Sequence, residues 1–242
     1  RGQNRWWSKP ILPLWLLRLS FATFSVDDPS DDWLHFAGRF PIFFLSLIGV
    51  LLTYGWVSRL YDRRTGIYSA IILATCPMYA LLAHQVMFDL PFVAFCAPAV
   101  GYYFLARSPQ GKPLHLYVFY LLTGLAFLSK WLLAFFIPIG IMFVYLVIRW
   151  DVGFFRRVGW TYWVATGALL AGAVAFFFSS VNDPAFAAML SVVALALVLI
   201  FLLGRDAAVE MGAGKRSLFL SFGLLLVVIV PWHLFMIIKH GW

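Results

Sequence analysis

Long apolar runs separated by short polar gaps dominate this sequence and restrict the folds available to it. A membrane-spanning helix needs about 20 mainly apolar residues. The runs that approach this length are 39–58, 66–83, 89–106, 114–129, 131–149, 160–178, 185–204 and 217–238. Only Lys130 separates the fourth run from the fifth, which predicts a very tight hairpin or a span that bends. We therefore expect an all-α polytopic membrane protein with about eight transmembrane helices.

Basic residues occupy every second gap between these runs. The basic gaps hold Arg59 with Arg63 and Arg64, Arg107 with Lys112, Arg149 with Arg156 and Arg157, and Arg205 with Lys215 and Arg216. The other gaps hold His84 with Asp89, then Lys130, then Asn182 with Asp183. Because cytoplasmic loops are enriched in lysine and arginine, the basic gaps are predicted to be cytoplasmic. The working face is then extracytoplasmic, although five more cations precede the first span on that side: Arg1, Arg5, Lys9, Arg18 and Arg39.

Composition agrees with an integral membrane protein. Apolar residues make up 63% of the chain, charged residues 12%, and the mean hydropathy is +0.90. The formal net charge of +8 would suggest a nucleic-acid partner in a soluble protein, but 11 of the 18 basic residues lie in the four basic gaps. The predicted topology accounts for them. The expected partners are therefore membrane lipids and no nucleic acid.

The chain before the first span is predicted to lie on the outer membrane surface. Residues 11–24 are apolar but too short to cross, and Pro13 and Arg18 interrupt them. This pattern is typical of an interfacial amphipathic helix, so we divide the chain into an extracytoplasmic segment, 1–38, and a transmembrane domain, 39–242. Cys76 and Cys96 lie in apolar runs and are expected to be buried thiols rather than a disulfide. The chain starts at Arg1 without a methionine, and we expect it to be a fragment.

Several polar residues at the predicted outer face have both a functional and a structural interpretation. Asp89, followed by Pro91, could cap a helix or act in a site, and Lys130 could bind a ligand or reach toward the lipid headgroups. Lys9 could be a basic anchor, and Arg39 an interfacial arginine at a helix start. His233 follows Pro231 and Trp232 and is more typical of packing than of ligand binding.

A metal site has weak support in this sequence. His84 and Asp89 could share a metal ion, but two ligands at this spacing are a weak signal. No metal ligand set and no firm cofactor are predicted, while a divalent metal remains an open alternative.

Taken in order, the motifs resemble a known family. They are Lys9-Pro10, Arg39-Phe40-Pro41, the segment 61–66 (YDRRTG), Phe88-Asp89-Leu90-Pro91, the segment 124–130 (GLAFLSK) and Pro231-Trp232. This order resembles that of the GT-C membrane glycosyltransferases, of the protein O-mannosyltransferase and lipid A aminoarabinose transferase type. The resemblance covers nearly the whole chain, from about Trp6 to Trp242.

The resemblance implies an enzyme that takes a sugar from a polyprenyl-phosphate carrier. The acceptor would be a lipid or a protein at the outer face, in a bacterial inner membrane with a periplasmic working side. Lys9 and Lys130 match the lysines that lie close to the donor phosphate. Arg39 matches the arginine of the family's Arg-x-Pro signature and is a candidate for a further phosphate contact. Asp89 matches the aspartate of the outer turn, and His84 and His233 are secondary candidates.

This chain departs from the family pattern at several positions. The main catalytic acid of the family is expected upstream of Arg1, and a C-terminal portion is expected beyond Trp242. Ser8 stands where an acidic residue often precedes the lysine, and Trp131 stands where glycine usually follows the second lysine. A fragment of this kind is expected to be inactive alone, so a noncatalytic scaffold is one alternative. A multispan transporter or lipid flippase is another, although such proteins commonly show repeated halves, which this sequence lacks.

Overall fold

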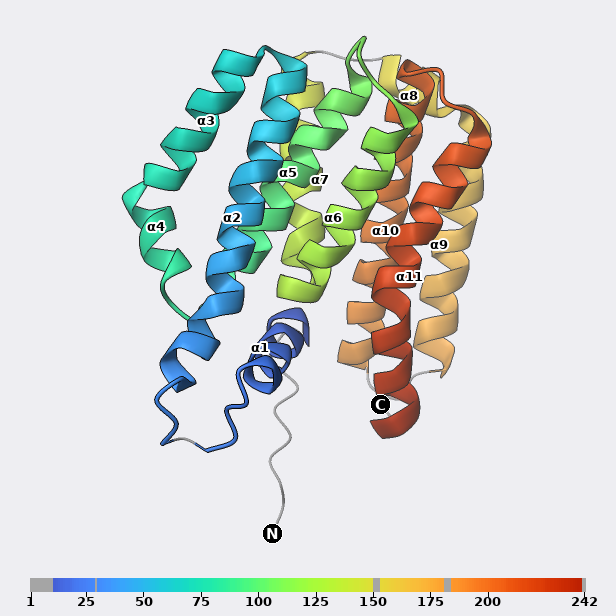
Figure 1. Ribbon diagram of the computed structural model, residues 1–242. Helices are drawn as coiled ribbons and strands as arrows, with labels where there is room; N and C mark the ends of the chain where they lie inside the picture. Colours follow the sequence, from blue (N-terminus) through green and yellow to red (C-terminus); the bar gives the residue numbers. More distant parts are fainter. Residues whose placement is uncertain (1–10, 29, 150–152, 181–183, 241–242) are drawn as a thin grey trace.

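A computed structural model describes residues 11–28, 30–149, 153–180 and 184–240, which are all-helical and contain no strand. The helices are α1 (Ile11–Thr23), α2 (Leu34–Leu60), α3 (Arg63–Thr75), α4 (Pro77–Ala83), α5 (Asp89–Arg107), α6 (Pro113–Lys130), α7 (Leu133–Ile148), α8 (Gly153–Val158), α9 (Trp160–Ser180), α10 (Pro184–Glu210) and α11 (Lys215–His240). Figure 1 shows that the long helices run up and down in alternation, as a bundle. The predicted all-α class is confirmed.

The two ends of the bundle carry different residues. In Figure 1, the helices α2, α5, α7 and α10 end at the upper end of the bundle, and α4, α6 and α9 end at the lower end, where α1 also lies. The basic gaps of the sequence therefore all lie at the upper end, and Asp89 and Lys130 lie at the lower end. The predicted separation of basic loops from the candidate site is thus a feature of the fold, whichever end faces the cytoplasm.

All eight apolar runs are helical. By length and composition, however, fewer than eight of the described helices qualify as membrane spans. Among the described residues, the helices that could cross a membrane are Leu34–Leu60, Asp89–Arg107, Ala187–Glu210 and Lys215–Phe235. The run predicted as one helix at 66–83 is broken: α3 and α4 meet at an angle of 64° and make a fifth span if they are counted together. Pro77 begins α4 and has no N–H to continue the helical hydrogen bonding. The count of eight spans stays a prediction.

The helices α5 and α6 form the centre of the bundle. Tyr103 of α5, with Phe119 and Tyr120 of α6, is completely buried. Close approach of the helices requires small residues at two positions. A Cβ atom at Gly101 would lie 2.3 Å from the Trp56 ring, and one at Gly204 of α10 would lie 1.9 Å from the Tyr120 hydroxyl.

The helix α1 confirms the short helix predicted at 11–24 and closes the lower end of the bundle. The Ser20 hydroxyl donates to the carbonyl of Ala37 over 2.6 Å, which fixes α1 against α2. Trp15 packs edge-on against Trp232 of α11, with ring centroids 5.3 Å apart. The helix α1 therefore packs at the end of the bundle where Asp89 begins α5 and Lys130 ends α6. Cys76 and Cys96 are both free thiols, as predicted, but only Cys96 is buried; Cys76, at the break between α3 and α4, is half-buried.

Candidate active site

The structure joins two of the predicted site residues directly. Lys130 is the last residue of α6 and Asp89 the first of α5, and the Lys130 ammonium donates a hydrogen bond to the Asp89 carboxylate. The side chains are 35% and 51% exposed, respectively. An exposed ion pair adds little to stability, so this pair is better suited to binding a ligand than to holding the fold together.

The capping interpretation of Asp89 is wrong in its geometry. Phe88 occupies the N-cap position of α5, and no side chain accepts a capping hydrogen bond there. Asp89 lies one residue later, where its carboxylate meets Lys130 instead of a backbone N–H. Its negative charge in the first turn still interacts favourably with the helix dipole.

The turn that follows Lys130 has an unusual backbone. Trp131 has a φ of 55° and a ψ of −135°, in a region that favours glycine because a side chain is strained there. Its ring centroid lies 5.9 Å from that of His233, and the Phe127 ring lies 5.3 Å from the same histidine. A tight hairpin around Lys130 is therefore confirmed, with a strained aromatic residue in place of the expected glycine.

His233 packs beside this hairpin. Its Nδ1 atom lies 2.8 Å from the carbonyl oxygen of Ile229, while Nε2 is buried and has no hydrogen-bond partner among the described residues. These features agree with the packing interpretation of His233. They also leave a polar atom close to the Lys130 turn, and its role as a secondary site residue stays a prediction.

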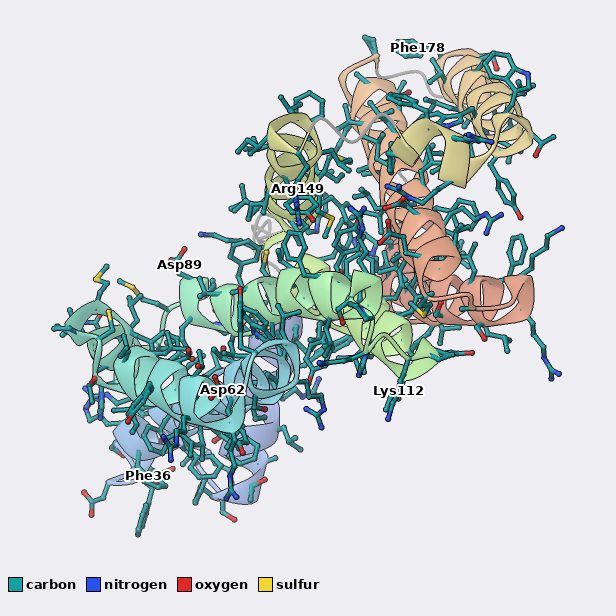
Figure 2. The ribbon with its side chains drawn as sticks, turned by 90° about the horizontal axis from the view of Figure 1, so that it is seen from above. Phe36, Asp62, Asp89, Lys112, Arg149 and Phe178 are labelled. Carbon is teal, nitrogen blue, oxygen red and sulfur yellow. The ribbon has the colours of Figure 1, made fainter. Side chains whose placement is uncertain are left out.

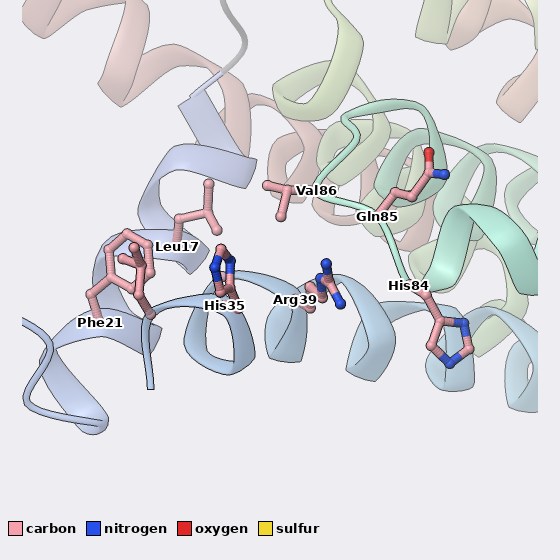
Figure 3. A pocket seen from close by; sticks show the side chains of 9 residues that line it. Leu17, Phe21, His35, Arg39, His84, Gln85 and Val86 are labelled. Atoms are coloured by element: carbon pink, nitrogen blue, oxygen red, sulfur yellow. The ribbon is translucent and has the colours of Figure 1, made fainter. Parts of the chain in front are cut away.

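Arg39 and His84 border a cavity of about 390 Å³ at the lower end. The cavity lies between α1, the start of α2 and residues 84–86. Figure 3 shows the Arg39 side chain extending toward Gln85 and Val86, whereas the His84 ring turns away. The His84 ring instead lies 6.1 Å from the Phe43 ring, and its Nδ1 atom is 2.8 Å from the carbonyl oxygen of Ala80.

The cavity and the ion pair belong to the same end of the bundle. Residues 84–86 line the cavity, and the chain then reaches Asp89 at the start of α5. Lys9, the third predicted phosphate-binding residue, lies outside the described residues. Within the described ranges, no group of three or more His, Cys, Asp or Glu side chains is arranged to hold a metal ion.

The sequence analysis missed a buried ionic network at the upper end. Asp206 of α10 is completely buried, and its carboxylate lies 2.6 Å from Nε of Arg157 and 3.3 Å from Nε of Arg107. Glu210 lies 3.3 Å from both arginines, and the Tyr103 hydroxyl donates to Asp206 over 3.3 Å. The network fixes α5, α8 and α10 together. Its only sequence signal is a pair of acidic residues that end an apolar run beside basic gaps.

The sequence was compared with known protein families, curated proteins and solved structures. The profile of a family described as dolichyl-phosphate-mannose-protein mannosyltransferase matches residues 8–178, well over half of the chain. The matched region contains Arg39, Asp89 and Lys130. No curated protein and no solved structure matches the chain.

Proposed function

Because the chain belongs to the dolichyl-phosphate-mannose-protein mannosyltransferase family, whose members are membrane glycosyltransferases, we propose which donor and which face it uses. The donor is a sugar linked to a polyprenyl phosphate, and transfer to a lipid or protein acceptor takes place at the extracytoplasmic face. The observation that carries this proposal is the exposed Lys130–Asp89 pair. It lies at the end of the bundle opposite the basic loops, together with Arg39 (Figure 1).

The chemistry of the donor explains the need for cations at this end. When the bond between the sugar and the carrier breaks, the carrier phosphate leaves as an anion, and the site must stabilise that developing charge. A lysine ammonium has three donors. Asp89 accepts one of them, which orients the group and leaves the others for phosphate oxygens. At the membrane interface the dielectric constant is lower than in water, so this interaction is stronger.

Arg39 supplies the second cation of the proposed site. Its guanidinium is exposed and borders the cavity at the lower end, and guanidinium groups bind phosphate through two parallel hydrogen bonds. Lys9 is proposed as a third cation from the family resemblance alone. Asp89 is engaged with Lys130, so we assign it an orienting role. The base that an acceptor hydroxyl requires is expected upstream of Arg1.

The distribution of polar groups favours transfer over transport. A transporter commonly binds its substrate near the bilayer midplane, between broken helices. Here the candidate residues lie where α5 and α6 meet the lower end of the bundle. A transporter would move a lipid-linked sugar across vesicles without forming a covalent product, and a transferase would form product without such flux.

The test is transfer of labelled sugar from a polyprenyl-phosphate donor by the full-length protein in vesicles. We expect Lys130→Ala and Arg39→Ala each to lower kcat/KM by tenfold or more, with the loss of one oxyanion-stabilising group, about a hundredfold to a thousandfold, as the upper range. Lys215→Ala removes an exposed lysine at the upper end and serves as the matched control. Near-normal transfer by both site variants would overturn the phosphate-binding assignment.

The proposed orientation places the lower end in the periplasm of a bacterial inner membrane. Single cysteines at Gln85 and at Gly214 test it, in a variant without Cys76 and Cys96, because these positions lie at opposite ends of the bundle. A membrane-impermeant thiol reagent applied to intact cells is expected to label the cysteine at 85 and not the one at 214. The reverse labelling would place the site on the cytoplasmic side.

A further inference from the structure

A second cavity, of about 1040 Å³, lies at the upper end of the bundle, opposite the candidate active site. One wall of the cavity is apolar and is formed by Trp56, Leu60 and Phe104. The other is formed by two cations and one aromatic ring, from Arg107, Arg149 and Tyr145. Tyr61, which is 67% exposed, also borders the cavity, as does the exposed Arg149. The cavity is therefore accessible from outside the bundle, and its volume is in the range of small-molecule sites.

Two guanidinium groups approach one ring inside this cavity. The guanidinium carbons of Arg107 and Arg149 lie 5.5 and 5.8 Å from the centroid of the Tyr145 ring. Figure 2, which looks down on this end, shows Arg149 at the near end of α7. Arg107 is paired with Asp206 and Glu210, so an anion beside this ring would balance chiefly the charge of Arg149.

The buried ionic network does not neutralise this charge. Arg107 and Arg157 are matched by Asp206 and Glu210, which pair with both arginines. Glu210 borders the cavity, but its two ion pairs offset its charge. Arg149 forms no ion pair with a carboxylate of the described residues, so the described residues that line the cavity keep one net positive charge.

The position of the cavity along the helices indicates what kind of anion it could bind. Arg107 ends α5, Arg149 follows α7, and Leu60 ends α2. The charged wall thus lies at the ends of these helices, where a bilayer crossed by the bundle would have its headgroups, and Trp56 and Phe104 lie further from the helix ends. Basic pockets between membrane helices bind anionic headgroups in this way.

We propose that this cavity binds an anionic phospholipid. Its phosphodiester would lie between Arg149 and Arg107, and its glycerol backbone would lie against Trp56, Leu60 and Phe104. Assignment of the lipid to the cytoplasmic leaflet rests on the orientation proposed above, whereas the binding itself does not. Because Arg107 and Arg157 also hold α5, α8 and α10 together, a lipid here would contact the network that positions the upper ends of these helices.

The test is binding of a fluorescent phosphatidylglycerol to the purified full-length protein in neutral detergent. Unlabelled phosphatidylglycerol, phosphatidylcholine and glycerol phosphate serve as competitors. We expect Arg149→Ala to weaken binding roughly fivefold to tenfold, the effect of one cation near a lipid phosphate, and Arg149→Lys to restore most of it. Arg216→Ala, which removes an exposed arginine at the same end of the bundle, is expected to stay within about twofold of the unaltered protein.

Three outcomes would overturn the proposal. Equal losses in the Arg149→Ala and Arg216→Ala variants would indicate general surface attraction rather than a site. Equal competition by phosphatidylcholine would indicate an apolar groove without charge recognition. Competition by glycerol phosphate as strong as that by the lipid would indicate a site for soluble phosphates. Because binding is measured without a sugar donor, a failure of the proposed transferase activity leaves this result interpretable.

Discussion

The Lys130 ammonium contacts the Asp89 carboxylate at the point where α6 ends and α5 begins, 41 residues apart in sequence. The pair is formed by two helix termini rather than by neighbouring residues. Both side chains belong to the central helix pair of the bundle, so their relative position depends on the packing of α5 against α6 and not on a flexible loop.

Removal of the Asp89 charge should affect donor binding more than stability. We expect Asp89→Asn to raise the donor KM several-fold because Lys130 loses the group that orients it. The free energy of unfolding should change by less than about 1 kcal/mol, as is usual for an exposed ion pair. Steady-state kinetics and thermal unfolding of the same preparation check both. A large loss of stability with an unchanged KM would show that the pair is structural.

The strained backbone at Trp131 allows a prediction about stability that does not depend on the contacts of the tryptophan ring. Trp131→Ala and Trp131→Gly both remove the ring that packs against His233, but only glycine adopts a φ of 55° without strain. The glycine variant should therefore be more stable than the alanine variant by about 1 kcal/mol. Thermal unfolding of the two variants measures this difference. Equal stability would mean that the residue does not keep this conformation.

Because Tyr120 closely approaches Gly204, replacement of this glycine should destabilise the protein. A Cβ atom at Gly204 would lie 1.9 Å from the Tyr120 hydroxyl, and Tyr120 is completely buried. We expect Gly204→Ala to destabilise the protein by about 1–3 kcal/mol, as overpacking does. Gly167→Ala in α9 is the control, because nothing lies within 4 Å of its Cβ position. A destabilisation no larger than in the control would contradict the packing of α6 against α10.

The buried network at Asp206 should contribute strongly to stability. Asp206→Asn removes the buried one of the two carboxylates that pair with Arg107 and Arg157 and leaves Glu210; removal of one partner from a buried ion pair costs up to about 3–5 kcal/mol. Asp32→Asn, in the exposed loop between α1 and α2, should have little effect. Thermal unfolding distinguishes the two. Equal melting temperatures would show that the arginines find other partners.

The N-cap of α3 leads us to predict that part of the protein's stability depends on pH. The Asp62 carboxylate accepts hydrogen bonds from the backbone N–H and hydroxyl of Thr65, and these bonds lower its pKa from the usual 3.8. Because the folded-state pKa is below the unfolded one, the cap stabilises the protein above the unfolded value, and the effect is lost as pH falls through the folded value.

Asp62→Ala should therefore be less stable than the unaltered protein at neutral pH. The difference should shrink as pH falls below the unfolded-state pKa and then through the lower folded-state pKa, below which the carboxyl is protonated in both states. Asp62→Asn keeps a capping group without a titrating charge, so its stability relative to Asp62→Ala should not change over this range. A difference between the unaltered protein and Asp62→Ala that persists in acid would show that the charge of the cap is not what stabilises α3.

Much of the fold could be predicted because apolar runs are a local property of the sequence. Each predicted run forms a helix, and the alternating basic gaps correctly predicted a bundle with two unlike ends. The break at Pro77 was visible as a proline, yet the run 66–83 reads as continuous because both of its halves are apolar. The break between α3 and α4 shows that an apolar run does not by itself predict a straight helix.

The site could be predicted only in part. Asp89 and Lys130 were selected by a family resemblance, and their contact depends on the register between α5 and α6, which no local pattern specifies. The Asp206 network was missed because its members come from three helices and each looks ordinary alone. The cavity beside Tyr145 likewise depends on where four helices end relative to one another.

The break between α3 and α4 has a consequence for the surrounding bilayer. At about 1.5 Å per residue, the 13 residues of α3 and the 7 of α4, bent by 64°, advance roughly 24 Å along the α3 axis. The hydrocarbon layer is about 30 Å thick, so if α3 and α4 together cross it, we expect the layer to thin beside them. The thinned region would lie beside α4, which leads into the cavity that Arg39 borders. In the proposed reaction, it would shorten the distance that the phosphate of a carrier lipid has to move to leave the acyl region.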